Sequence, residues 1–187
     1  PASNNYMTFN VLDEELEGYL QLIKTDTETG KAVKIANTAF ALYRLDEKDR
    51  KLIDAAKEAT ARSYAPYSRF SVGAAALLAN GVIVTGTNQE NAAYPSGTCA
   101  ERTTLFYANS QYPDQPVDTL AIAARNESDF LESPIPPCGA CRQVLLETEQ
   151  RFHQPMRILL YSKNDIYVLE GTKDLLPLSF GSEYLKG

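Results

Sequence analysis

The three cysteines of this 187-residue chain fall in two short motifs, and a glutamate stands two residues after the first cysteine. The motifs read Thr98-Cys99-Ala100-Glu101-Arg102 and Pro136-Pro137-Cys138-Gly139-Ala140-Cys141. Three thiolates can hold a zinc ion and leave its fourth position to water, as in catalytic zinc sites. The pattern therefore predicts a hydrolytic zinc enzyme that binds Zn²⁺ through its three cysteines, with Glu101 outside the ligand set.

Two simpler interpretations compete with a catalytic site. Free cysteines are often small buried apolar residues, and a Cys-x-x-Cys pair also occurs in redox and structural zinc sites. A structural site would need a fourth protein ligand, and the single histidine, His153, stands at the far end of the helix predicted to carry Cys141. That separation is about 18 Å along the helix axis, so His153 is more typical of a surface residue.

Both cysteine motifs stand where a helix is predicted to begin, over residues 100–110 and 139–152. Helix N-termini stabilise thiolates and lower their pKa. Three thiolates on Zn²⁺ leave a formal charge of about −1, which would make a bound water a weaker acid unless cations offset it. Arg102 and Arg142 follow the two motifs directly and are candidates for donating hydrogen bonds to the sulfurs.

The rest of the chain predicts the elements that position these motifs. A helix capped by Asp46 runs to Ser63, and Asn80-Gly81 is a strong signal for a hairpin turn. Five strands are predicted, at residues 70–79, 82–87, 119–125, 157–162 and 166–170. A hairpin followed by alternating helices and buried strands predicts the α/β class, as a three-layer α/β/α sandwich with a mixed five-stranded sheet.

Several motifs together resemble the cytidine deaminases, specifically the small homotetrameric zinc type. The resemblance extends over residues 46–185, about three quarters of the chain. The matching segments are Asn88-Gln89-Glu90-Asn91-Ala92-Ala93-Tyr94, Cys99-Ala100-Glu101-Arg102-Thr103, Pro137-Cys138-Gly139-Ala140-Cys141-Arg142-Gln143, residues 64–70 and residues 175–181.

This resemblance implies a catalytic domain at residues 46–187 that deaminates cytidine and deoxycytidine to uridine and deoxyuridine in pyrimidine salvage. Zinc would be bound by Cys99, Cys138 and Cys141 and would activate water for attack on C4 of the base. Glu101 would take a proton from this water, protonate N3 and deliver a proton to the leaving amine. Arg102 would donate hydrogen bonds to the cysteine sulfurs.

The resemblance also implies a nucleoside-binding site and a homotetramer with shared active sites. Asn88 and Glu90 would hydrogen-bond the ribose hydroxyls, and Phe70 would line the base or sugar pocket. The backbone of Ala100 would read the edge of the base. Phe180 would reach the active site of a neighbouring subunit. The competing expectations for these four side chains are ordinary loop polarity and plain packing.

The charge, the apolar stretches and the cysteine count argue against a nucleic-acid partner, a membrane span and a disulfide framework. The formal net charge is −6, so the phosphate backbone of a nucleic acid finds no general attraction here. The longest apolar stretches are about eight residues, well short of the roughly 20 needed to span a bilayer. An odd cysteine count argues against a disulfide framework and favours a cytoplasmic location.

Two functions remain as alternatives to the deamination of cytidine and deoxycytidine. One is the deamination of another aminopyrimidine nucleoside, and the other is the role of a zinc-stabilised binding module.

Residues 1–45 are predicted to be a separate N-terminal extension with a short β segment. Residues 18–43 weakly resemble the first strands of the prealbumin-like modules of bacterial surface adhesins. Lys24 stands where such modules place the lysine of an isopeptide bond, but the strand that would carry its asparagine partner is missing, so we predict no such bond. Too few strands remain for an independent sheet.

Overall fold

This computed structural model of the chain describes residues 45–185. They belong to a unit that begins at Leu45. The β segment predicted over residues 18–43, including Lys24, lies outside the described residues. Within the described part, no helix combines the length and the apolar character that crossing a membrane requires.

The described elements follow the predicted order. Four short 3₁₀ helices lie between or after the main elements: η1 (Thr60–Arg62), η2 (Tyr94–Ser96), η3 (Thr172–Asp174) and η4 (Ser182–Leu185). The main elements are α1 (Glu47–Ala59), β1 (Ser71–Leu78), β2 (Ile83–Thr87), α2 (Ala100–Gln111), β3 (Val117–Arg125), α3 (Gly139–Phe152), β4 (Arg157–Tyr161) and β5 (Ile166–Leu169).

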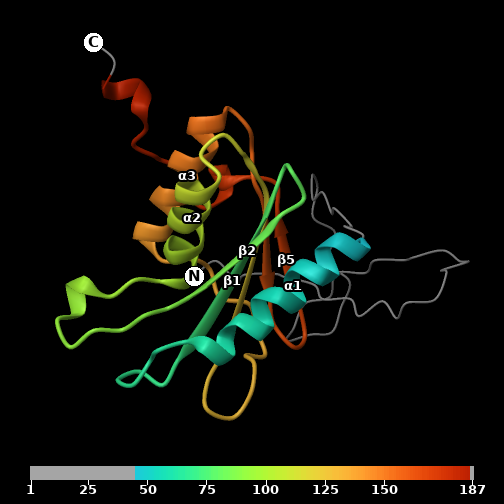
Figure 1. Ribbon diagram of the computed structural model, residues 1–187, viewed down its shortest axis with the longest axis vertical. Helices are drawn as coiled ribbons and strands as arrows, with labels where there is room; N and C mark the ends of the chain where they lie inside the picture. The colour runs from blue at the N-terminus through green and yellow to red at the C-terminus, as the bar shows by residue number, and fades with distance from the viewer. Residues whose placement is uncertain (1–44, 186–187) are drawn as a thin grey trace, which may run out of the picture. The chain divides into compact units, whose positions relative to one another are not determined.

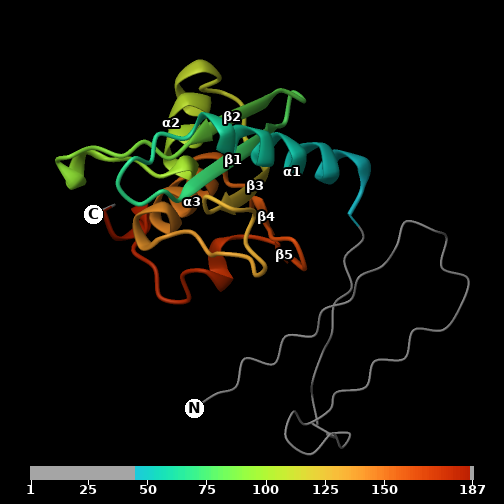
Figure 2. The ribbon, with the colours of Figure 1, turned by 90° about the horizontal axis from the view of Figure 1, so that it is seen from below.

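The five strands form one mixed sheet in the order β2-β1-β3-β4-β5, and they lie side by side in that order in Figure 2. Strand β1 pairs antiparallel with β2 and with β3, and β4 pairs antiparallel with β5. Strands β3 and β4 are parallel, and α3 supplies the long crossover that a parallel pair requires. The predicted sheet is confirmed.

Helices cover both faces of this sheet (Figure 1). Side chains alternate along each strand, so β1, β3, β4 and β5 each contribute to two hydrophobic clusters, one on either face of the sheet. On one face, α1 packs Leu52, Ile53 and Ala56 against small strand residues such as Ala121. On the other face, α2 and α3 pack against larger strand residues such as Ile122. The described unit is therefore the predicted α/β sandwich, and α2 and α3, which carry the cysteine motifs, share one layer.

The N-terminus of α1 matches its predicted cap. A side-chain oxygen of Asp46 accepts a hydrogen bond from the backbone N–H of Asp49 at 2.8 Å, and a carboxylate oxygen of Asp49 accepts one from the Asp46 N–H at 3.2 Å. This reciprocal capping box satisfies two backbone donors that the first turn leaves open. Asp49 also forms a partly buried ion pair with Arg157 of β4 at 2.6 Å, which joins the start of α1 to the sheet.

Gly73 of β1 lies against backbone atoms at the C-terminal end of α1. A Cβ atom there would overlap the carbonyl oxygen of Ala56 and lie 2.8 Å from the backbone nitrogen of Thr60. We expect Gly73→Ala to lower the free energy of unfolding by about 3 kcal/mol, because backbone atoms cannot move aside as a flexible side chain would. Chemical denaturation measures this loss. Gly139→Ala is the control, since a Cβ there meets no atom within 4 Å, and an equal loss in both variants would contradict the packing argument.

Candidate active site

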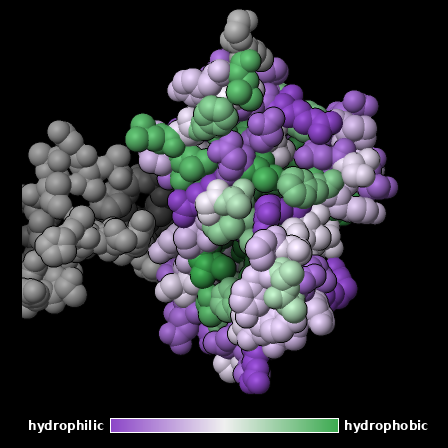
Figure 3. Space-filling model, turned by 90° about the vertical axis from the view of Figure 1, so that its left-hand side faces the viewer, coloured by the Kyte–Doolittle hydropathy of each residue, from purple (hydrophilic) through white to green (hydrophobic). Residues whose placement is uncertain are grey.

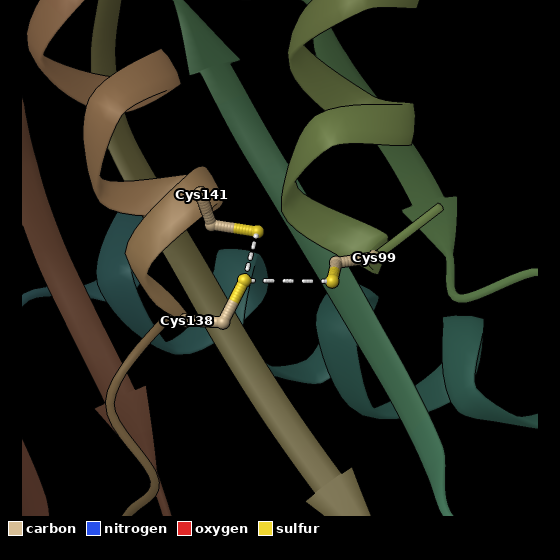
Figure 4. Close-up of side chains that lie close together, drawn as sticks. All are labelled: Cys99, Cys138 and Cys141. Atoms are coloured by element: carbon tan, nitrogen blue, oxygen red, sulfur yellow. Dashed lines mark hydrogen bonds between the residues drawn. The ribbon is translucent and has the colours of Figure 1, made fainter. Parts of the chain in front are cut away.

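The three cysteine sulfurs converge between the first turns of α2 and α3 (Figure 4). The Sγ atoms of Cys99 and Cys138 lie 3.7 Å apart, those of Cys138 and Cys141 lie 3.4 Å apart, and all three lie within 4.8 Å of one another. Two sulfurs on a tetrahedral zinc, each about 2.3 Å from the metal, are about 3.8 Å apart. The spacing therefore fits three ligands of one zinc ion.

The helices place these sulfurs by their N-terminal geometry. Cys99 is the N-cap of α2 and Cys138 is the N-cap of α3, and neither side chain caps its own helix by a hydrogen bond. Cys141 lies in the first turn of α3 and is buried, whereas Cys138 is exposed. The positive ends of two helix dipoles thus point at one thiolate cluster, which lowers the cost of its negative charge. One side of the cluster faces solvent.

Protons are unevenly distributed over the thiols in the absence of metal. The pKa of Cys99 is lowered to about 5, because its sulfur accepts hydrogen bonds from the thiol of Cys141 and, despite partial burial, from Arg102. The pKa of Cys141 is raised, because its thiol donates to Cys99 and is buried. A divalent cation bound here would displace the proton that these sulfurs share.

Glu101 is the second residue of α2 and lies beside the sulfurs. Its side chain is only 5% exposed. Burial raises the pKa of this carboxyl, and the neighbouring thiolate of Cys99 acts in the same direction. A carboxyl group whose pKa is raised toward neutrality can both accept and release a proton at physiological pH. The structure thus brings the predicted non-ligand carboxylate next to the predicted ligands.

The two candidate arginines have different partners. Arg102 approaches Cys99 with its Nη2 atom 3.8 Å from Sγ, and the pKa of Arg102 is raised by this hydrogen bond. Arg142 instead donates from Nε to the carbonyl oxygen of Pro137 at 2.8 Å and from Nη1 to the carbonyl oxygen of Leu175 at 3.0 Å. The expectation that Arg142 donates to sulfur is therefore replaced by two backbone contacts, since its side chain leaves α3 in another direction.

The polar residues predicted to bind ribose hold the loop that precedes β1. The amide oxygen of Asn88 accepts from the hydroxyl of Ser63 at 2.6 Å and from the N–H of Val72 at 2.8 Å, while its amide nitrogen donates to the carbonyl of Phe70 at 2.8 Å. These contacts fix the backbone of Phe70, the predicted pocket residue, directly before the start of β1.

Glu90 is tied to the same loop by different atoms. One of its carboxylate oxygens accepts from the backbone N–H groups of Tyr67 and Ser68 at 2.9 and 3.2 Å. Hydrogen bonding from Ser68, through its side chain and its N–H, and from the Tyr67 N–H lowers the pKa of Glu90. Glu90 is therefore a stable carboxylate at neutral pH.

The remaining residues singled out in the sequence lie in different parts of the structure. Ala100 is buried at the first position of α2, so its backbone N–H belongs to the open end of that helix. Phe70 is partly buried. Phe180 lies in the C-terminal segment, is 58% exposed and stacks on Tyr184 with ring centroids 5.8 Å apart. His153 is exposed at the C-cap of α3, and only the three cysteines form a cluster of potential metal ligands among the residues described.

Sequence reasoning missed the residues that hold the C-terminal segment. Gln143 donates from Nε2 to the carbonyl oxygen of Phe180 at 2.8 Å, and Gln150 accepts from the N–H of Ser182 at 3.1 Å. Both lie on α3, where a glutamine is also compatible with an ordinary solvent-facing position. The signal available in the sequence was that polar side chains recur on α3 at helical spacing beside a matching C-terminal motif.

Exposed hydrophobic side chains also lie on the surface, and Figure 3 shows apolar patches between polar groups on one face of the described unit. A large contiguous apolar patch marks a surface for interaction, whereas single exposed apolar side chains are ordinary. The most exposed are Leu178 (94%), Tyr94 (75%), Leu185 (74%) and Tyr184 (69%).

Comparison with protein families gives a direct match. The family described as "Cytidine and deoxycytidylate deaminase zinc-binding region" matches residues 46–153. A cytidine deaminase of Halalkalibacterium halodurans is 48% identical over 96 residues, which cover 51% of this chain and 68% of the relative. A cytidine deaminase of Mycobacterium tuberculosis is 39% identical over 133 residues, which cover 70% of this chain and 87% of the relative.

Solved structures agree with this match. The crystal structure of a cytidine deaminase from Burkholderia pseudomallei superposes with a TM-score of 0.61 and 39% sequence identity, covering 70% of this chain and 98% of that one. The crystal structure of a cytidine deaminase from Mycobacterium tuberculosis superposes with a TM-score of 0.57 and 33% sequence identity. The match covers 73% of this chain and 99% of that one.

Proposed function

Because the chain belongs to the family of zinc-dependent cytidine and deoxycytidylate deaminases, we propose that it deaminates cytidine and deoxycytidine hydrolytically, with Glu101 as the proton carrier. The observation that carries this proposal is the convergence of three sulfurs within 4.8 Å beside a carboxylate that is 5% exposed. Zinc is the cofactor, and Cys99, Cys138 and Cys141 would hold it.

The proposed reaction replaces the 4-amino group of the base by the oxygen of water. Zinc, when bound, supplies a Lewis acid that brings the pKa of a water ligand close to neutral. Glu101 takes one proton from the water and gives it to N3 while the oxygen bonds to C4. It then carries the second proton from that oxygen to the amino nitrogen, so that the C4–N bond breaks and ammonia leaves. Arg102 stabilises the thiolate of Cys99 during this cycle.

We assign ribose recognition to Asn88 and Glu90. An amide nitrogen has two hydrogens and a carboxylate about four lone-pair sites, so both groups have capacity beyond their contacts with the loop. The lowered pKa of Glu90 supports a role as an acceptor for ribose hydroxyls. Phe70 would line the base or sugar pocket, and the backbone of Ala100 would contact the base.

We further propose a cytoplasmic homotetramer whose catalytic domain is residues 46–187 and whose N-terminal extension is residues 1–45. The family match that begins at residue 46 supports the boundary, and the exposed Phe180 and Leu178 support a covered C-terminal surface. The three cysteines are free, which suits a reducing compartment.

The loss of cytidine ultraviolet absorbance on adding purified protein tests the activity, with zinc quantified in the same sample and a chelator-treated control. We expect zinc-dependent conversion of cytidine and deoxycytidine to uridine and deoxyuridine. No turnover at about one zinc per chain would reject cytidine as substrate and favour another aminopyrimidine nucleoside. Failure with a panel of such nucleosides would favour the binding module.

Subunit mixing tests the shared site. Glu101→Gln removes the proton carrier of a subunit's own site, whereas Phe180→Ala removes the ring proposed to complete a neighbour's site. After co-refolding, we expect a mixture of the two variants to regain activity above the sum of the separate variants, because some sites then receive an intact Glu101 and an intact Phe180. A mixture that never exceeds this sum, or a fully active monomer by light scattering, would contradict the shared site.

A further inference from the structure

One helix carries both the metal-binding turn and the attachments of the C-terminal segment. Helix α3 has Cys138 as its N-cap and contains Cys141, and four of its side chains bind the chain between Thr172 and Glu183. Their order along the helix is Arg142 to the carbonyl of Leu175, Gln143 to the carbonyl of Phe180, Glu149 to the N–H and hydroxyl of Thr172, and Gln150 to Ser182 and Glu183.

Arg142 differs from the other three because it also contacts the metal-binding turn. Its Nε–H donates to the carbonyl of Pro137, the residue directly before Cys138, at 2.8 Å, while Nη1 donates to the carbonyl of Leu175 at 3.0 Å. Its backbone N–H donates to the carbonyl of Cys138 at 2.9 Å. The planar guanidinium fixes these two side-chain donors relative to each other.

Both acceptor carbonyls belong to buried residues. Pro137 is among the fully buried side chains, and Leu175 is 8% exposed. A buried carbonyl that loses its donor pays a desolvation cost, so the turn would shift to find another partner. Any shift of Pro137 moves Cys138, because the two residues are adjacent.

We propose that Arg142 is a positioning residue that sets the orientation of Cys138 for the metal and, through Leu175, the start of the segment that carries Phe180. Gln143 then fixes the far end of this segment at the carbonyl of Phe180. Arg142 thereby couples metal binding to the placement of the aromatic ring. The substrate part of this inference rests on the proposed function, whereas the metal part does not.

The test compares zinc transfer and substrate affinity in three variants. Zinc-loaded protein is mixed with a chromogenic chelator and the rate of zinc transfer is recorded. We expect Arg142→Gln to transfer zinc about tenfold faster than the unmodified chain, the effect typical of losing a group that orients a ligand. Gln143→Ala should leave this rate unchanged. Both variants should raise KM for cytidine about fivefold, the effect of one lost hydrogen bond on a binding equilibrium.

Arg151→Gln is the matched control. Arg151 lies on the same helix and also donates to a backbone carbonyl, that of Pro113, at 2.8 Å, but it touches neither the metal-binding turn nor the C-terminal segment in the contacts described. We expect it to change neither the zinc transfer rate nor KM. The proposal is overturned if Arg142→Gln transfers zinc no faster than Arg151→Gln, or if Gln143→Ala accelerates transfer equally.

A second variant and a readout that does not need deaminase activity complete the test. Should Arg142→Gln not fold, Arg142→Lys takes its place, because its single ammonium cannot reproduce the fixed pair of donors. It should also accelerate zinc transfer relative to Arg151→Gln, and an unchanged rate overturns the proposal. If the unmodified chain does not deaminate cytidine, the proposed function fails, while the zinc transfer rates still decide the role of Arg142.

Discussion

Replacement of Glu101 by glutamine should lower kcat for cytidine by about 10²–10⁴-fold, the contribution typical of a positioned proton carrier, and leave the zinc content unchanged. The amide has nearly the same shape as the carboxyl, so the packing around this buried position is preserved. The amide is neither an acid nor a base near neutral pH, so it cannot carry a proton between water and the base. Steady-state kinetics together with metal analysis of the same sample measures both quantities.

Glu147→Gln serves as the matched control, since Glu147 is an exposed glutamate of α3 outside the proposed chemistry. It should retain full activity. If Glu101→Gln kept most of its rate, Glu101 would not be the proton carrier, and if it lost its zinc, the residue would act on the metal site instead.

Replacement of Cys141 by serine should remove most of the zinc and reduce turnover by about 10³-fold. Cys141 is the buried member of the cluster, and a serine hydroxyl is a poor zinc ligand compared with a thiolate. Loss of the Lewis acid removes several kcal/mol of transition-state stabilisation, and each 1.36 kcal/mol is a factor of ten in rate. Metal analysis and cytidine turnover on the same preparation test this.

Chelation of the unmodified protein should reproduce the loss, and added zinc should reverse it. The control is His153→Asn, which changes the chain's single histidine at an exposed position with φ of 51°, a conformation that asparagine tolerates. Its zinc content and activity should equal those of the unmodified chain. A serine variant that still bound one zinc per chain would show that position 141 is not a ligand.

Local signals predicted most of the fold. The Asp46 cap, the Asn80-Gly81 turn and the two helices after the cysteine motifs all depend on residues close in sequence, and each element begins within about two residues of its predicted start. The mixed sheet followed from the order of these elements. The Asn80-Gly81 turn predicted the pairing of β1 with β2, but the sequence could not specify the pairing of β1 with β3, because its register depends on contacts between strands that are distant in the chain.

In the site, too, features encoded by neighbouring residues could be predicted, whereas contacts between distant segments could not. The spacing of Cys99, Glu101 and the Cys138 motif expresses chemistry that a short segment can encode. The partners of Arg142 could not be predicted, because the carbonyl of Leu175 lies 33 residues away and a carbonyl acceptor leaves no trace in residue identity. The role of Asn88 in holding the loop before β1 was missed for the same reason.

The cluster joins cysteines from two helices, and this has a thermodynamic consequence for the whole domain. Cys99 and Cys138 are 39 residues apart in the chain, so a metal ion that binds both closes a long loop of the unfolded polypeptide. The ion binds the native arrangement far better than the unfolded chain, and its binding free energy adds to the free energy of folding. Zinc therefore acts as a reversible cross-link as well as a cofactor, and the melting temperature of the domain rises with the concentration of free zinc.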